Sequence, residues 1–226
     1  MATPAPAADG ESLYVTGKNG ERRMKGRTIT VPVVTGTCAF YLGKKARASE
    51  YQSHKWTVYL RSPTGEDLSH VIKKVTFVLH ESFQNPKRDV EFPPYELTEV
   101  GWGEFDIVVT VHFREDVQEG PLELYHRLKL YDDTGAANPK KPVVQEVYDE
   151  MVLWQPTEAF FSRYATHTAR AAPPSQLAQF YSSFAPDAEY QRIQRARQRL
   201  AQIRANVENT AAQLEAQEAA SGWAGA

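Results

Sequence analysis

A chain of 226 residues with 26 basic and 28 acidic side chains is long enough for one well-packed domain and an appended segment. Its net charge of -2 gives it no overall attraction to nucleic acid or anionic membranes. No stretch reaches the roughly 18 apolar residues of a membrane helix, the start lacks the features of a secretion signal, and the single cysteine, Cys38, excludes an internal disulfide. We therefore expect a soluble protein of a reducing, intracellular compartment, with Cys38 as a small buried hydrophobe.

Residues 1–27 are rich in alanine and proline at first and in basic side chains afterwards. Such a segment has too little apolar surface to order itself, so we interpret it as a flexible basic arm. Its basic group and a second one nearby could contact DNA phosphates without reading sequence, or act as import signals. Solvated surface is the plainer interpretation. The two groups are Arg22-Arg23-Met24-Lys25 and Gly43-Lys44-Lys45-Ala46-Arg47.

Residues 28–156 alternate apolar and polar side chains with the period of two that is typical of strands. Turn signals such as Asn85-Pro86 separate the runs and leave no room for crossover helices. The pattern predicts an all-β, immunoglobulin-like antiparallel β-sandwich with Trp56 as a candidate core aromatic, although the cysteine pair of true immunoglobulin domains is missing. The runs are Trp56–Leu60, Val75–Leu79, Phe105–Phe113, Leu122–Leu130 and Val143–Leu153.

Two further segments follow the predicted sandwich. Residues 157–184 contain Ala171-Ala172-Pro173-Pro174 and predict a linker with a weak helix on either side. Residues 185–220 consist mostly of strong helix formers, with apolar residues at a 3-4 spacing, and predict a coiled-coil helix. A lone amphipathic helix folded onto the sandwich is the alternative. The a positions are Ile193, Leu200, Val207 and Leu214, and the weaker d positions are Ala196, Ile203, Thr210 and Gln217.

Two segments at strand ends, residues 79–83 and 101–105, carry side chains suited to a flat, neutral amide such as an acylated lysine. Phe83 and Trp102 can supply stacking faces, and the Ser82 oxygen can accept the N–H of the ligand amide. The glycines on both sides of Trp102 expose its backbone, whose N–H, or that of Gly103, can donate to the acyl carbonyl. An unmodified ammonium would lose its hydration there without a compensating carboxylate. A methyl-lysine cage and plain core packing are the alternatives.

Several motifs in order resemble the YEATS family. They are His80-Glu81-Ser82-Phe83, Pro93-Pro94-Tyr95, Gly101-Trp102-Gly103-Glu104-Phe105 and Leu124-Tyr125-His126-Arg127-Leu128-Lys129-Leu130. His54-Lys55-Trp56 also resembles the family's strand that opens with a histidine and a tryptophan two residues apart. The resemblance covers residues 25–153 and implies an immunoglobulin-fold reader of acetyl- and crotonyl-lysine on histone tails.

The resemblance implies a role for each matching residue. Phe83 and Trp102 become the walls of an acyl-lysine slot, Ser82 the partner of the ligand amide, and the Trp102 backbone N–H the donor to the acyl carbonyl. His80, Gly101, Gly103 and Phe105 are implied to shape the pocket. Gln52 departs from the family pattern, which often has an aromatic residue or histidine there. The following helix resembles a nuclear branch of the family, shared by histone-acetyltransferase and remodelling complexes, whose helix docks on scaffold subunits.

We expect no catalytic residue, no cofactor and no metal site. His80 and Ser82 lack a base-orienting acid, and no Gly-x-Ser-x-Gly elbow occurs. The six histidines show no metal-ligand spacing, and His112 and His126 are interpreted as structural. Two functions remain. The first is a nuclear reader of acylated histone tails within a chromatin complex. The second is a structural or histone-chaperone-like scaffold subunit whose pocket is not used.

Overall fold

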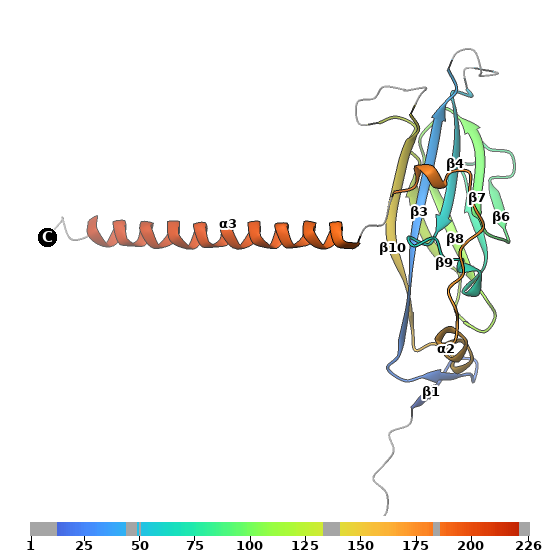
Figure 1. Cartoon of the computed structure of the whole chain (residues 1–226), viewed down its shortest axis with the longest axis horizontal. Helices are drawn as coiled ribbons and strands as arrows, with labels where there is room; N and C mark the ends of the chain where they lie inside the picture. The colour runs from blue at the N-terminus through green and yellow to red at the C-terminus, as the bar shows by residue number, and fades with distance from the viewer. Residues whose placement is uncertain (1–12, 44–48, 50, 133–140, 183–185, 222–226) are drawn as a thin grey trace, which may run out of the picture. The chain divides into compact units, whose positions relative to one another are not determined.

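The computed structural model describes residues 13–43, 49, 51–132, 141–182 and 186–221 (Figure 1). The chain divides into two compact units, Met1–Ser182 and Ser183–Ala226, and each is described by itself. None of the described helices is both long and apolar enough to cross a membrane.

The first unit is built from two four-stranded antiparallel sheets and a small hairpin. One sheet has the strand order β10-β3-β4-β7, and the other has the order β6-β5-β8-β9. The strands are β1 (Tyr14–Thr16), β2 (Arg22–Met24), β3 (Thr28–Tyr41), β4 (His54–Arg61), β5 (Ile72–Val78), β6 (Lys87–Val90), β7 (Tyr95–Gly101), β8 (Asp106–Phe113), β9 (Leu122–Arg127) and β10 (Val143–Trp154).

The inward-facing residues of both sheets form one core. Trp56 of β4, Phe77 of β5 and Val109 of β8 are all fully buried, and each large apolar side chain buried in this way stabilises the fold by about 1.5–3 kcal/mol. The predicted antiparallel sandwich and the core position of Trp56 are confirmed. Cys38 of β3 is also buried, and burial raises the pKa of its thiol to about 12. It therefore stays protonated and acts as the small core hydrophobe that the sequence predicted.

Three strands of the two sheets are absent from the predicted runs, namely β3 and two edge strands. β6 pairs with β5, and β7 pairs with β4, so each lies at the outer edge of its sheet. Their sequences, Lys-Arg-Asp-Val and Tyr-Glu-Leu-Thr-Glu-Val-Gly, alternate weakly. Charged residues are common on edge strands because they discourage pairing with another chain, and they hide the period of two.

The prediction of a flexible arm over residues 1–27 is wrong for its described part. Tyr14–Thr16 and Arg22–Met24 pair as an antiparallel hairpin, and the Met24 N–H donates to the Pro156 carbonyl over 2.9 Å. The Arg23 guanidinium pairs with Glu21 at 2.7 Å and Glu119 at 2.6 Å. The basic side chains thus hold the hairpin to the sandwich, which composition alone cannot indicate. Residues 1–12 lie outside the described residues.

The prediction for residues 157–184 is partly wrong. A short helix does lie on either side of residues 171–174, but the described part belongs to the sandwich unit and is not a linker. Thr157 caps α2 (Glu158–Ala165) by accepting the Phe160 N–H at 3.1 Å, and Phe160 is fully buried in the sandwich core. The Arg163 guanidinium forms two hydrogen bonds with Asp116, of 2.5 and 2.9 Å. Figure 1 shows α2 beside the β1 hairpin at one end of the sandwich.

The chain after α2 continues across the sandwich. The Asp67 N–H donates to the Arg170 carbonyl at 2.8 Å, beside the short helix η1 (Leu68–His70). Further on, η2 (Ala178–Phe180) places Phe180 against Phe40 of β3, with ring centroids 5.3 Å apart. Tyr181 lies 4.8 Å from the ring of Tyr59 on β4. Residues 157–182 therefore belong to the sandwich unit.

The second unit contains the helix α3 (Pro186–Ser221) of 36 residues. Its described apolar side chains are exposed: Ile193 by 50%, Leu200 by 68%, Ile203 by 52% and Val207 by 62%. The helix itself agrees with the sequence analysis. The coiled-coil pairing stays a prediction, and the side chains of Leu214 and Gln217 lie outside the described residues.

Candidate functional site

The predicted site residues come together where three strands begin or end. His80, Ser82 and Phe83 follow the end of β5, and Phe105 precedes β8. Gly101 is the last residue of β7, where it pairs with His54 at the start of β4. Trp102 and Gly103 follow directly. The antiparallel register therefore gathers segments from both sheets at one end of the sandwich.

The aromatic side chains form a connected cluster around Trp56. The Trp56 ring packs edge-on against Phe83 and Phe105, with centroid distances of 5.9 and 5.8 Å, and Phe83 lies 5.6 Å from Phe105. His80 lies 6.0 Å from Phe105. Trp56 is fully buried, whereas Phe83 and Phe105 are half-buried. The sequence analysis assigned Trp56 to the core only, but the structure also makes it the floor of the candidate site.

Gly101 lies against this floor. A Cβ atom at Gly101 would lie 3.3 Å from Trp56 Nε1 and 3.6 Å from Phe83 Cζ. The glycine therefore lets the main chain approach both rings closely. At Gly103, by contrast, a Cβ atom would meet nothing within 4 Å, so space does not require glycine there.

The hydroxyl of Ser82 is oriented by His80. The Ser82 backbone N–H donates to His80 Nδ1 over 3.2 Å, so this ring nitrogen is an acceptor. The Ser82 hydroxyl, 2.9 Å from the same nitrogen, therefore donates its proton to it. The lone pairs of Ser82 Oγ are left to accept a hydrogen bond from outside. Both residues are exposed, so an external N–H can reach them.

The peptide group between Gly101 and Trp102 is held on its carbonyl side. The Ser53 hydroxyl donates to the Gly101 carbonyl over 3.4 Å and lies 2.9 Å from His54 Nδ1. Burial lowers the pKa of His54, so its ring is neutral near pH 7 and can donate from Nδ1 to Ser53. In a trans peptide the C=O and N–H point in opposite directions. The Trp102 N–H is therefore directed away from Ser53.

The Trp102 ring has a different neighbour from the one that the sequence suggested. Its side chain is 60% exposed, and its ring lies 6.1 Å from that of Tyr51 at an angle of 62°. Phe83 instead packs against Trp56 and Phe105. From the sequence, only Gln52 was placed at the rim of the pocket, and Tyr51 was missed. The signal was visible, because Tyr51 is an aromatic residue directly before Gln52, which departs from the family pattern.

The Glu104 carboxylate has partners away from the predicted slot. Glu104 Oε1 accepts the N–H groups of Leu130 at 2.7 Å and Tyr131 at 3.2 Å. This carboxylate therefore supports the chain beyond β9. A hollow of about 190 Å³ between β4, β7 and residues 172–181 is lined by none of the predicted site residues.

The chain is similar to proteins of a known family. Residues 51–132 match the model of the YEATS family. The transcription initiation factor TFIID subunit 14b of Arabidopsis thaliana is 54% identical over 155 residues, which are 68% of this chain and 57% of that protein. The protein AF-9 homolog of Eremothecium gossypii is 36% identical over 199 residues, covering 86% of this chain and 95% of that protein.

Solved structures show the same similarity. The crystal structure of the Yaf9 YEATS domain bound to H3K27ac superposes with a TM-score of 0.57 and 39% identity. The superposition covers 64% of this chain and 99% of that one.

Proposed function

The chain belongs to the YEATS family, and we propose that it binds acylated lysine side chains of histone tails. The observation that carries the proposal is the pairing of His80 with Ser82, which leaves a hydroxyl oxygen as an acceptor beside buried aromatic rings. An acyl-lysine amide needs such an acceptor for its N–H. The similar Yaf9 YEATS domain has a crystal structure in which it is bound to H3K27ac, and this supports the same class of ligand for the present protein.

The geometry supports the remaining parts of the proposed site. The acyl chain lies against Phe83 with Trp56 beneath it, and the acyl carbonyl accepts the Trp102 N–H. Gly101 gives the ligand room to approach the main chain, and Phe105 and His80 close the aromatic cluster. Trp102 and Tyr51 form an exposed aromatic wall at the rim. A charged ammonium would lose hydration against these rings without a carboxylate partner, which gives selectivity for the neutral amide.

Titration calorimetry tests the proposal. Acetylated and crotonylated peptides of the histone H3 tail should bind more tightly than the unmodified peptide, and Trp102→Ala should abolish the difference. Equal binding of modified and unmodified peptides to the unaltered protein would contradict the reader function. That result would favour the second candidate, a structural or histone-chaperone-like scaffold subunit whose pocket is not used.

We further propose that the protein acts in the nucleus as a subunit of a chromatin-modifying or remodelling complex. The support is the family and the naming of a relative as a subunit of a transcription initiation factor. The apolar side chains exposed along α3 suit docking on a scaffold subunit. Deleting residues 185–226 should leave peptide binding intact and abolish co-purification with the complex. If co-purification survived, docking would have to be assigned to the sandwich.

The proposed contact with DNA phosphates has little support in the described residues. Arg23 is paired with Glu21 and Glu119, and Arg22 lies 3.3 Å from Glu158. These arginines are engaged within the protein, so we do not include DNA in the proposed function. Residues 44–47 of the second basic group lie outside the described residues.

A further inference from the structure

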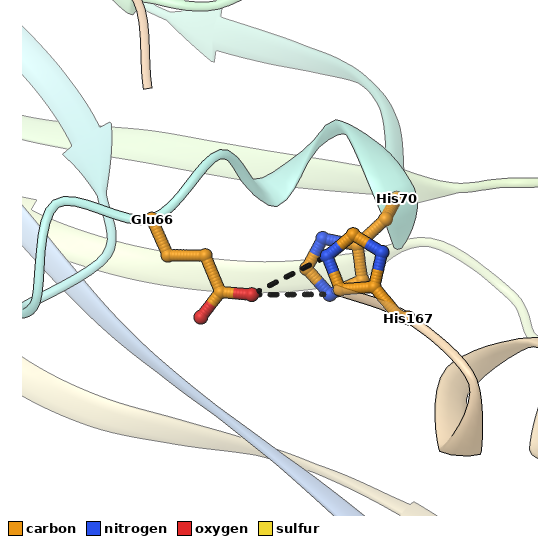
Figure 2. Close-up of side chains that lie close together, drawn as sticks. All are labelled: Glu66, His70 and His167. Carbon is orange, nitrogen blue, oxygen red and sulfur yellow. Dashed lines mark ion pairs between the residues drawn. The ribbon is translucent and has the colours of Figure 1, made fainter. Parts of the chain in front are cut away.

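Glu66, His70 and His167 form a cluster away from the proposed acyl-lysine site (Figure 2). Glu66 precedes η1, His70 ends η1, and His167 follows α2. One potential ligand atom from each residue lies within 4.8 Å of the other two. Glu66 Oε1 lies 3.5 Å from His167 Nε2 and 4.0 Å from His70 Nε2. The sequence analysis expected no metal site, because the two histidines are far apart in the chain and show no ligand spacing.

Main-chain hydrogen bonds fix the two segments that carry the cluster. The Asp67 N–H donates to Arg170 at 2.8 Å, and the Ala172 N–H donates to Gly65 at 2.9 Å. These bonds flank an antiparallel bridge between Glu66 and Ala171. The backbones are therefore positioned by contacts that do not depend on the three side chains.

The hydrogen bonds of His70 determine which ring nitrogen is available. His70 Nδ1 lies 2.7 Å from the Asp67 carbonyl oxygen. A carbonyl can only accept, so Nδ1 carries the proton and Nε2 has its lone pair directed to the side of Glu66. The Asp67 carbonyl thereby favours the tautomer in which Nε2 of His70 can bind a metal.

His167 lacks a hydrogen bond at the corresponding atom. Its Nε2 is buried and has no hydrogen-bond partner among the described residues. The rings of His70 and His167 are stacked, with centroids 3.8 Å apart and an angle of 10° between their planes. Two nitrogens and a carboxylate oxygen are thus gathered at one point. A positive species placed among them would neutralise the carboxylate and satisfy the orphaned nitrogen.

We propose that Glu66, His70 and His167 bind a Zn²⁺ ion through Oε1 and the two Nε2 atoms. Two imidazoles and one carboxylate are an established donor set for zinc, with a water completing the tetrahedron. Ligand bonds of about 2.0–2.2 Å require donor atoms about 3.3 Å apart. The observed 3.5 and 4.0 Å from Glu66 Oε1 to the two nitrogens are close to that separation, so the main adjustment is in the orientation of the rings. Magnesium and calcium favour oxygen ligands, so they fit the histidines poorly.

The relative orientation of the His70 and His167 rings must change when zinc binds. A nitrogen lone pair lies in the plane of its ring, so two parallel rings cannot direct both lone pairs at one ion. Zinc would therefore splay His167 from His70. Arg163, whose side chain donates to the His70 carbonyl over 2.6 Å, is the nearby cation, but its charge is offset by the ion pair with Asp116 at 2.5 Å.

The position of the cluster indicates a structural consequence. The cluster lies beyond the end of β4, whereas the acyl-lysine site lies at the start of this eight-residue strand, a separation of about 25 Å. Zinc would join the segment after α2 to the η1 loop at the end of the sandwich away from the peptide. We therefore expect zinc to raise thermal stability without changing peptide affinity.

Titration of the chelator-treated full-length protein with ZnCl₂ at neutral pH tests the proposal. One equivalent should bind, raise the midpoint of thermal unfolding, and shift the side-chain ¹⁵N resonances of His70 and His167. Glu66→Gln and His167→Ala should each weaken zinc binding at least tenfold, whereas His112→Gln, which alters a histidine elsewhere, should leave it unchanged. Circular dichroism of both variants would show that they fold.

Two outcomes would overturn the proposal. One is zinc affinity that is equal in the unaltered protein and in His167→Ala, which would place the ion elsewhere. The other is a stability that depends on pH through these histidines but not on zinc, because a proton shared within the cluster would then be the positive species.

Discussion

His80 Nδ1 accepts hydrogen bonds from both the backbone N–H and the hydroxyl of Ser82, at 3.2 and 2.9 Å. This pairing turns a freely rotating hydroxyl into an acceptor of fixed direction. We predict that Ser82→Ala weakens binding of an acetylated histone peptide about fivefold, as expected for one lost hydrogen bond of about 1 kcal/mol. His80→Ala should weaken it less, because the serine oxygen remains but is no longer oriented.

A double-mutant cycle provides the control for this prediction. If His80 acts through Ser82, the double variant should bind the acetylated peptide about as well as Ser82→Ala alone. Additive losses would show that His80 contacts the ligand independently. Affinity for the unmodified peptide should be unchanged in all three variants.

We predict that Gly101→Ala reduces acyl-peptide affinity about tenfold with little change in overall stability. The added Cβ would lie 3.3 Å from Trp56 Nε1 and 3.6 Å from Phe83 Cζ. The contact with Phe83 is an ordinary one, but Trp56 is fully buried and cannot move easily, so the main chain at position 101 must shift beside Phe83 in the proposed slot. Calorimetry and thermal unfolding measure the two effects. The matched control is Gly103→Ala, whose Cβ meets no atom within 4 Å. An equal loss in both variants would show that backbone freedom, not space beside Phe83, is what binding needs.

We predict that Tyr51 contributes more to the rim than Gln52 does. Tyr51 holds its ring 6.1 Å from that of Trp102, and aromatic pairs of this kind contribute about 0.5–1.5 kcal/mol. Tyr51→Ala should therefore weaken acyl-peptide binding about fivefold, and Gln52→Ala by less than about twofold. Calorimetric titration of both variants with the same peptide decides between them. A larger loss of affinity in Gln52→Ala than in Tyr51→Ala would show that position 52 forms the rim of the pocket.

The sequence was sufficient for the sandwich because core residues such as Val109 alternate with outward-facing residues along their strand. It was insufficient for β6 and β7, whose polar residues stand on both faces. At the candidate site, residue types could be read from motifs, but their neighbours could not. The contact of Trp102 with Tyr51 depends on how loops from different strands meet. The same limit applies to the Glu66 cluster, which exists only because residues 170–172 fold back onto residues 65–67.

Residues 157–182 pack on the sandwich, so we expect them to contribute to its stability. Phe160 is fully buried, so Phe160→Ala should lower the free energy of unfolding by about 3–5 kcal/mol, the cost of emptying an aromatic core position. Ser162→Ala on the exposed face of α2 is the matched control and should change it by less than about 0.5 kcal/mol. Chemical denaturation of both variants measures the difference. A small effect at Phe160 would mean that residues 157–182 unfold separately from the sandwich.

His126 should make the stability of the sandwich sensitive to acid. Its ring is 1% exposed and lies between the hydroxyls of Thr35, at 3.3 Å, and Thr37, at 3.2 Å. Burial lowers the pKa of the ring from 6.5 to about 4. Between these pH values the unfolded chain binds a proton that the folded chain excludes. The stabilisation is therefore complete above pH 6.5 and is lost as the pH falls towards 4, by about 3 kcal/mol in total.

Burial also lowers the pKa values of His54 and His70, so their effects have the same sign, and a single acid-unfolding curve cannot identify His126. The comparison is with His126→Gln, which keeps one hydrogen-bonding group near each threonine but cannot be protonated. Denaturation at a series of pH values should show a shallower loss of stability for this variant between pH 6.5 and 4. Parallel curves for the two proteins would mean that the His126 ring admits water or a counter-ion when it is charged, and that the excluded proton belongs to another histidine.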